Sequence, residues 1–248
     1  DAEKTRRGIY VLIYNTTITV KHIYIKNCYI HDVDGMKDID KTGAIIFDID
    51  KTGNGKFDDV VVEGNHIRNC EREGIIIATG GSEENLSTNI RVIENVIEDI
   101  KGDGIKVTYC QSPVIEYNKL VRCARNATAN LSAIYISNSN NGIIQYNEVY
   151  NTERGSKSGY AYCVGSGCMG TIVQYNYSQN NPKAFIRIQS TSTSKSSNTV
   201  IRYNISVGDG YGSVAGEDED GVISIYGPVE DEQLYNAQIY NNLFITYA

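Results

Sequence analysis

Basic and tyrosine side chains recur at corresponding positions in a series of short alternating segments. In each segment, apolar residues occupy every second position, and the polar positions between them include Lys106, Tyr135, Tyr162, Arg187 and Tyr226. Because successive side chains of a strand point to opposite faces, these five are predicted to share one exposed sheet face. Aromatic and cationic groups repeated along such a face could follow a chain of sugars. An ordinary solvated sheet face is the alternative interpretation.

Two reactions would use these residues in different ways. A lyase acting on a uronate needs a cation to neutralise the carboxylate and a base to remove the proton beside it. Lys106 or Arg187 would supply the charge, and Tyr162 or Tyr135 would donate a proton to the leaving group. In this hypothesis Lys106, Tyr162 and Arg187 are catalytic candidates. Tyr135 and Tyr226 are candidates for binding the substrate.

Two carboxylates offer the alternative of hydrolysis. Asp103 and Glu73 precede glycines at equivalent turn positions of neighbouring repeats. If the repeats stack as parallel strands, about 4.8 Å separates such positions. A glycoside hydrolase uses two carboxylates roughly 5–9.5 Å apart. Asp103 and Glu73 are therefore hydrolase candidates, with an ordinary turn beside glycine as the competing interpretation.

An acidic segment between two predicted strands has the pattern of a calcium loop. Its oxygen-bearing side chains alternate with other residues and glycines, and the candidate ligands are Asp48, Asp50, Asn54 and Asp58. This pattern resembles an EF-hand loop but lacks the flanking helices and the final bidentate glutamate. It favours either a Ca²⁺ ion held between two strands or a plain Asp/Gly turn.

One internal repeat, apolar-x-Tyr-Asn, predicts the elements that position these side chains. Clear copies end at Asn118, Asn147, Asn176 and Asn204, and weaker copies end at Asn27, Asn65, Asn95 and Asn242. The spacing between successive copies ranges from 23 residues, between Asn95 and Asn118, to 38 residues, between Asn204 and Asn242. A fixed motif at variable spacing indicates a constant coil with loops of different length. Helical periodicity is absent.

The repeat therefore predicts an all-β chain, a parallel β-helix solenoid of about eight coils. We expect residues 1–248 to form a single domain that is a section of a longer solenoid. The repeated asparagines are expected to stack and pass side-chain hydrogen bonds from coil to coil. The tyrosines before them, at 117, 146, 175 and 203, are expected to form a second ladder. The six cysteines are expected to be buried thiols, with a Cys163–Cys168 bridge as the alternative.

Composition narrows the classes of partner. The formal net charge of −7 argues against binding a nucleic acid through bulk charge. No apolar run is long enough to span a bilayer, so no membrane insertion is expected. We expect a monomer.

Several stretches resemble right-handed β-helix proteins of the pectate-lyase-like superfamily, especially bacterial members that act on polysaccharides. They read NCYIHDVDG (27–35), IIQYNEV (143–149), GTIVQYNYS (170–178) and VIRYNIS (200–206). This resemblance implies a secreted or cell-surface protein whose partner is a polysaccharide. It also implies a lyase or glycoside hydrolase. A non-catalytic binding or adhesion solenoid and a section of a phage tailspike are the alternatives. Some relatives carry aspartates in the strand at 158–168, which here has no carboxylate, so no active-site residue is transferred.

Overall fold

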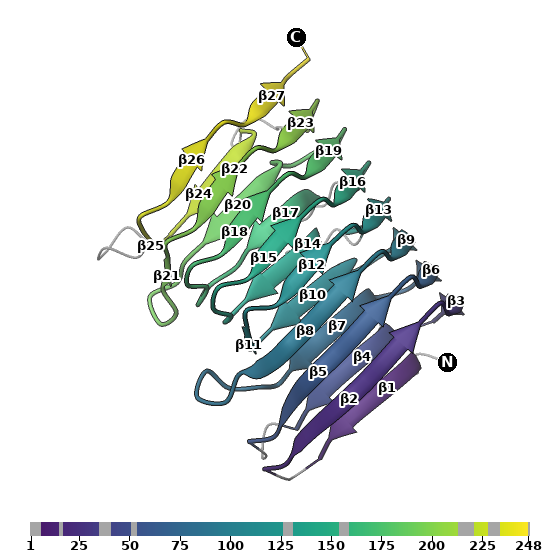
Figure 1. The fold of residues 1–248 in the computed structure, drawn as a ribbon. Coiled ribbons are helices and arrows are strands. Elements are labelled where there is room, and N and C mark those ends of the chain that lie inside the picture. The colour runs from purple at the N-terminus through teal and green to yellow at the C-terminus, as the bar shows by residue number, and fades with distance from the viewer. Residues whose placement is uncertain are drawn as a thin grey trace.

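The chain folds as a stack of coils made of parallel strands (Figure 1). The computed structural model describes residues 6–14, 17–34, 41–50, 54–125, 131–153, 159–212, 221–227 and 234–247. Within these ranges there are strands and no helices, and every strand pair is parallel. Each of eight coils gives one strand to each of three long sheets, called here sheets A, B and C. The predicted parallel β-helix of about eight coils is confirmed.

The strands of sheet A, in spatial order, are β1 (Arg7–Ile13), β4 (Gly43–Ile49), β7 (Glu73–Thr79), β10 (Ile105–Thr108), β14 (Ser132–Ser137), β17 (Tyr160–Val164), β20 (Ile186–Gln189) and β24 (Ile223–Tyr226). Those of sheet B are β2 (Thr19–Lys26), β5 (Lys56–Glu63), β8 (Ser87–Ile93), β12 (Val114–Glu116), β15 (Ile143–Gln145), β18 (Ile172–Gln174), β22 (Val200–Arg202) and β26 (Gln238–Tyr240), with β11 (Cys110–Gln111) also paired to β8. Those of sheet C are β3 (Tyr29–Val33), β6 (His66–Cys70), β9 (Val96–Ile100), β13 (Lys119–Val121), β16 (Glu148–Tyr150), β19 (Tyr177–Gln179), β23 (Ile205–Val207) and β27 (Leu243–Ile245). A short pair, β21 (Ser196–Ser197) with β25 (Leu234–Tyr235), lies beside them.

Columns of apolar side chains fill the interior of the solenoid. Parallel pairing aligns equivalent residues of successive coils, so Ile75, Ile105 and Ile134 occupy one interior column of sheet A. β-branched residues suit such columns because their stiff side chains pack well against neighbours on a pleated sheet. Packing therefore determines the residue types at the inward positions. The outward positions of each strand can hold polar side chains that bind or react with a ligand.

The asparagine ladder forms at the turn from sheet B to sheet C. Hydrogen bonds of 2.9–3.0 Å run from the backbone N–H and the side-chain amide of each asparagine to the Oδ1 of the next, through Asn65, Asn95, Asn118, Asn147, Asn176, Asn204 and Asn242. The predicted ladder is confirmed, with one correction. Cys28 occupies the first position, because its N–H donates to Asn65 Oδ1. Asn27 lies one residue earlier, at the left-handed turn position.

Replacing Asn147 with alanine is expected to lower the free energy of unfolding by about 1–3 kcal/mol. Its amide donates to the carbonyls of Ile115 and Gln145 and to Asn176 Oδ1, all in the buried turn. Its Oδ1 accepts two bonds from Asn118. Urea unfolding of the variant and of Lys119→Ala, an exposed neighbour, would measure the effect. An unchanged midpoint for Asn147→Ala would contradict the ladder.

The tyrosine ladder also forms, directly before the asparagines. Neighbouring rings at 117, 146, 175 and 203 stack with centroids 5.0–5.3 Å apart and planes within 8° of parallel. All four residues have positive φ, and their rings are partly exposed. Because each ring covers the face of the next, the faces inside the ladder are occupied. The ladder therefore stabilises the turn and leaves few ring faces for a ligand.

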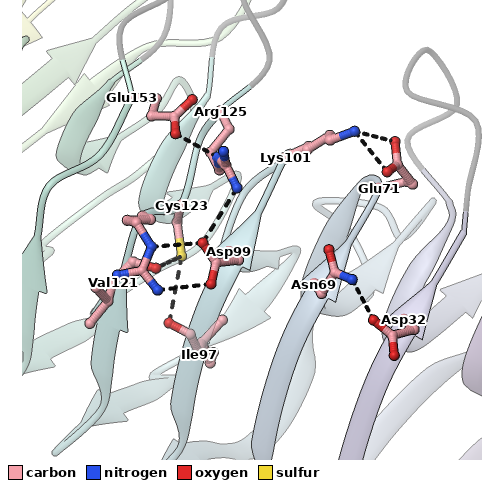
Figure 2. Close-up of polar contacts among 11 residues, drawn as sticks. Asp32, Asn69, Glu71, Ile97, Asp99, Lys101, Val121, Cys123, Arg125 and Glu153 are labelled. Carbon is pink, nitrogen blue, oxygen red and sulfur yellow. Dashed lines mark hydrogen bonds and ion pairs between the residues drawn. The ribbon is translucent and has the colours of Figure 1, made fainter.

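Ion pairs link the turns that lead from sheet C into sheet A (Figure 2). Lys101 reaches Glu71 of the preceding coil at 2.7 Å. Arg125 lies between Asp99, at 3.3 Å, and Glu153, at 2.6 Å, and so joins three coils. Exposed pairs of this kind contribute little individually but gain from being a network. They hold the edge at which the strands of sheet A begin.

Five of the six cysteines are buried thiols, as predicted. Cys70, Cys110, Cys123, Cys163 and Cys168 are buried, and Cys28 is half-buried. The alternative bridge does not form, because Cys168 packs in the core while Cys163 points out of sheet A. Burial raises the pKa of Cys70 to about 11 and the pKa values of Cys163 and Cys168 to about 12.

Alkylation of the native protein at neutral pH is expected to modify Cys28 first. A thiol reacts as its thiolate, which burial suppresses at the other five positions. Mass spectrometry of the protein after iodoacetamide treatment, with and without denaturant, would count the accessible thiols. Rapid native labelling of Cys163 would contradict the burial seen here.

Candidate functional site

A pocket of about 150 Å³ opens on the outer face of sheet A. It spans four consecutive coils, and each coil contributes two residues to it. The lining consists of Asp103 and Lys106, Ser132 and Tyr135, Tyr160 and Cys163, and Arg187 and Gln189. Two basic side chains and one carboxylate lie among them, so positive charge exceeds negative charge by one in the lining.

Strand register explains why distant residues meet at this pocket. Lys106 pairs with Tyr135, Tyr135 with Cys163, and Cys163 with Arg187. These four form one outward column, set between interior columns on either side. The structure thus brings together three predicted site residues, Lys106, Tyr135 and Arg187. Their roles in binding or catalysis remain predictions.

The outward orientation predicted for Tyr162 is wrong. Tyr162 pairs with Ile134 and Ile186 and is fully buried in the core, where its hydroxyl donates to the carbonyls of Asn147 and Tyr177 at 3.1 and 3.0 Å. The simple alternation fails because Ala161 and Tyr162 both pack inward where the chain enters sheet A. Burial raises the pKa of Tyr162 well above its ordinary value. This side chain is therefore structural.

Tyr160 belongs to the pocket but was not among the predicted site residues, as is also true of Ser132, Cys163 and Gln189. It lies two positions before Tyr162, lines the pocket and is 1% exposed. Its hydroxyl is buried and has no hydrogen-bond partner among the described residues. One feature of the sequence could have indicated the correct orientation. Tyr162-x-Val164 corresponds to Ile134-x-Ile136 of the preceding coil, and this alignment assigns Tyr162 to the interior.

Aromatic rings hold both cations of the pocket. The guanidinium of Arg187 lies 5.3 Å from the centroid of the Tyr160 ring and 4.8 Å from that of Tyr226, and the residue is only 5% exposed. The ammonium of Lys106 lies 5.8 Å from the centroid of Tyr135. Such contacts restrict a cation without neutralising its charge. Tyr226 therefore contacts Arg187, which lines the pocket. Its predicted contact with substrate stays a prediction.

Tyr135 fits closely over its neighbouring strand. A Cβ at Gly165 would lie 2.5 Å from the Tyr135 hydroxyl, so only glycine leaves room for the ring there. Burial raises the pKa of Tyr135 well above its ordinary value, so the phenol stays protonated at neutral pH. A protonated phenol can donate a hydrogen bond to a ligand.

The two carboxylates predicted to work as a pair lie in neighbouring coils but in different surroundings. Asp103 lines the pocket, and its Oδ1 accepts the N–H of Ser132 at 2.8 Å. Glu73 is fully buried, accepts the N–H of Asp103 at 2.6 Å and lies 3.2 Å from the guanidinium of Arg72. Gly102 permits this packing, because a Cβ there would lie 2.6 Å from Glu73 Oε2. Glu73 thus supports the loop of Asp103 and does not line the pocket.

Two of the four predicted calcium ligands, Asp48 and Asp58, contact other protein groups on different sheets. Asp48 on β4 accepts from Tyr10 and Lys41, at 2.9 and 2.6 Å. Asp58 on β5, in another sheet, contacts Lys21, Thr88 and Asn89 at 2.8–3.0 Å.

Asp50 and Asn54 flank residues 51–53, which lie outside the described ranges. In the described part of the chain, no group of three or more histidine, cysteine, aspartate or glutamate side chains is placed to hold a metal ion. Calcium binding remains a prediction, which a comparison of melting temperatures with and without a chelator would check.

The fold and the matching family model together define the class of protein. A family described as the right-handed beta helix region matches residues 3–131, more than half of the 248-residue chain. The chain belongs to this family. In the part of it that the structure describes, no helix is long and apolar enough to cross a membrane.

Two lacto-N-biosidases are similar to this chain. A lacto-N-biosidase of Bifidobacterium longum is 27% identical over 134 residues, which cover 40% of this chain and 8% of that protein. The crystal structure of a GH136 lacto-N-biosidase from Eubacterium ramulus matches with a TM-score of 0.75 at 24% identity, over 97% of this chain and 45% of that one. This chain therefore spans less than half the length of either protein, and the structural match establishes a shared fold.

Proposed function

We propose that this protein acts on an acidic carbohydrate bound across the outer face of sheet A. The observation that carries the proposal is the pocket itself, which Lys106, Arg187 and Asp103 line on a face built from stacked coils. Two restrained cations suit a sugar carboxylate, and a guanidinium can grip it with two bonds. The similarity to two lacto-N-biosidases supports a carbohydrate as the ligand.

The lining favours elimination over hydrolysis. In an elimination, a base takes the proton beside the uronate carboxylate, the carbon–oxygen bond to the leaving sugar breaks, and an acid protonates the leaving oxygen. Lys106 and Arg187 would stabilise the charge that develops on the carboxylate. Hydrolysis needs a second carboxylate across the bond, whereas Asp103 is the one carboxylate among the described lining residues.

Hydrolysis is the second candidate, and the relatives favour it. The E. ramulus protein is described as a member of GH136, a glycoside hydrolase family, and shares the fold over nearly all of this chain. In that case Asp103 would act as the acid, with its partner carboxylate outside the described lining. We further propose that the protein is secreted or displayed on the cell surface, where polysaccharides are met.

A degradation screen followed by mass analysis of the products tests the proposal. The purified protein would be incubated with acidic polysaccharides and with neutral controls of similar linkage. Elimination gives a product one water lighter than hydrolysis and with a new double bond. We expect cleavage of an acidic chain with the lighter product. Binding without cleavage would indicate an adhesion solenoid, and action on neutral chains alone would contradict the acidic substrate.

A further inference from the structure

We propose that Tyr160 contacts the ligand directly and helps to select acidic sugars, with its hydroxyl and the Arg187 guanidinium binding the same carboxylate. This inference rests on the function proposed above and names a residue for it. Tyr160 and Arg187 both line the pocket, and the guanidinium lies 5.3 Å from the centroid of the Tyr160 ring. A phenol O–H and a guanidinium are both donors, and a carboxylate can accept from both.

The Tyr160 hydroxyl is buried at a cost in free energy that a hydrogen-bonded tyrosine in the core does not have. It is buried and has no hydrogen-bond partner in the described part of the protein. A buried polar group without a partner costs about 1–3 kcal/mol. Tyr162, two residues away and equally buried, donates to two backbone carbonyls. Within the described ranges, the protein therefore provides hydrogen-bond acceptors for the Tyr162 hydroxyl but none for the Tyr160 hydroxyl beside the pocket. We infer that a ligand supplies the acceptor for Tyr160.

The lining explains why an anion would be the ligand. Ser132 N–H is already used by Asp103, and the pocket keeps an excess of one positive charge. A ligand oxygen placed beside Arg187 would meet two donors, the guanidinium and the Tyr160 hydroxyl. A carboxylate gains more from such donors than a hydroxyl group does, because charge-assisted hydrogen bonds are roughly twice as strong.

Two variants that each remove one oxygen atom test this inference. Tyr160→Phe keeps the ring beneath Arg187 and deletes the unpartnered hydroxyl, and Tyr162→Phe is the matched control in the core. In the ligand-free protein, we expect the melting temperature of Tyr160→Phe to equal or exceed that of the wild type. Tyr162→Phe is expected to melt at a lower temperature, because it removes the hydrogen bond of the buried Tyr162 hydroxyl.

Binding is then measured by calorimetry with galacturonate and glucuronate, and with galactose and glucose as neutral counterparts. We expect the wild type to prefer the uronates and Tyr160→Phe to bind them roughly 10–100-fold more weakly, while folded Tyr162→Phe binds as the wild type does.

Three outcomes would overturn the inference. A Tyr160→Phe melting temperature as low as that of Tyr162→Phe would show that the hydroxyl is already satisfied. Unchanged uronate affinity in Tyr160→Phe would remove Tyr160 from the site while leaving the proposed function intact. No uronate binding by the wild type would overturn both.

Discussion

Replacing Arg187 with alanine is expected to weaken binding of an acidic oligosaccharide roughly 100-fold, the size of a lost charge-assisted pair of hydrogen bonds. Arg187→Lys is expected to lose less, about tenfold, because an ammonium keeps the charge but not the planar fork. Binding by the wild type should weaken as salt is added, and the salt dependence should be smaller in Arg187→Ala. Calorimetric titrations at two ionic strengths would give these values.

The control for this prediction is Arg202→Ala. Arg202 lies on sheet B, bonded to Gln174 and Tyr240, and has the same charge without facing the pocket. It is expected to bind as the wild type does. Arg187 is nearly buried, so melting temperatures must show that each variant is folded under the conditions of the titration. Equal affinity in Arg187→Ala and the wild type would contradict a site on this face.

Replacing Glu73 with alanine is expected to destabilise the protein by about 3–5 kcal/mol, because it leaves the buried Arg72 without its charged neighbour. The same substitution removes the acceptor for the Asp103 N–H. Glu73→Gln is expected to lose less, since it keeps an acceptor oxygen. Urea unfolding of both variants would measure the two values.

The opposite outcome would support the predicted catalytic role of Glu73. An alanine variant that keeps its unfolding midpoint and loses cleavage of the substrate would show a role in chemistry. Asp103→Asn is the informative comparison, because Asp103 lines the pocket and Asn can still accept the Ser132 N–H. That variant is expected to stay folded and to bind a uronate at least as tightly, since it removes the only negative charge among the described lining residues.

The fold was predictable because an asparagine marks the same turn in seven of the eight coils. A buried asparagine is costly unless its amide and carbonyl are satisfied, and stacking in a ladder satisfies both. The motif therefore indicated stacked coils, and the structure confirms seven asparagines in one ladder. Its first position was misassigned to Asn27, because Cys28 fills the ladder position without resembling asparagine.

The site was harder to predict than the fold. Alternation placed Lys106, Tyr135 and Arg187 on one face, and the register confirms that arrangement. It failed at Tyr162, because two successive residues point inward where sheet A begins. The sequence also could not show which of the two carboxylates lines the pocket. Asp103 and Glu73 both precede glycine, and they differ only in how their loops pack. The unpartnered hydroxyl of Tyr160 follows from three-dimensional packing and has no counterpart in the repeat.

A crystal structure of the protein soaked with an acidic disaccharide tests the central claim most directly. We expect a sugar carboxylate between Lys106 and Arg187 on the outer face of sheet A, within hydrogen-bond distance of the Tyr160 hydroxyl. A sugar bound on sheet B or sheet C, with the pocket of sheet A unchanged, would contradict it.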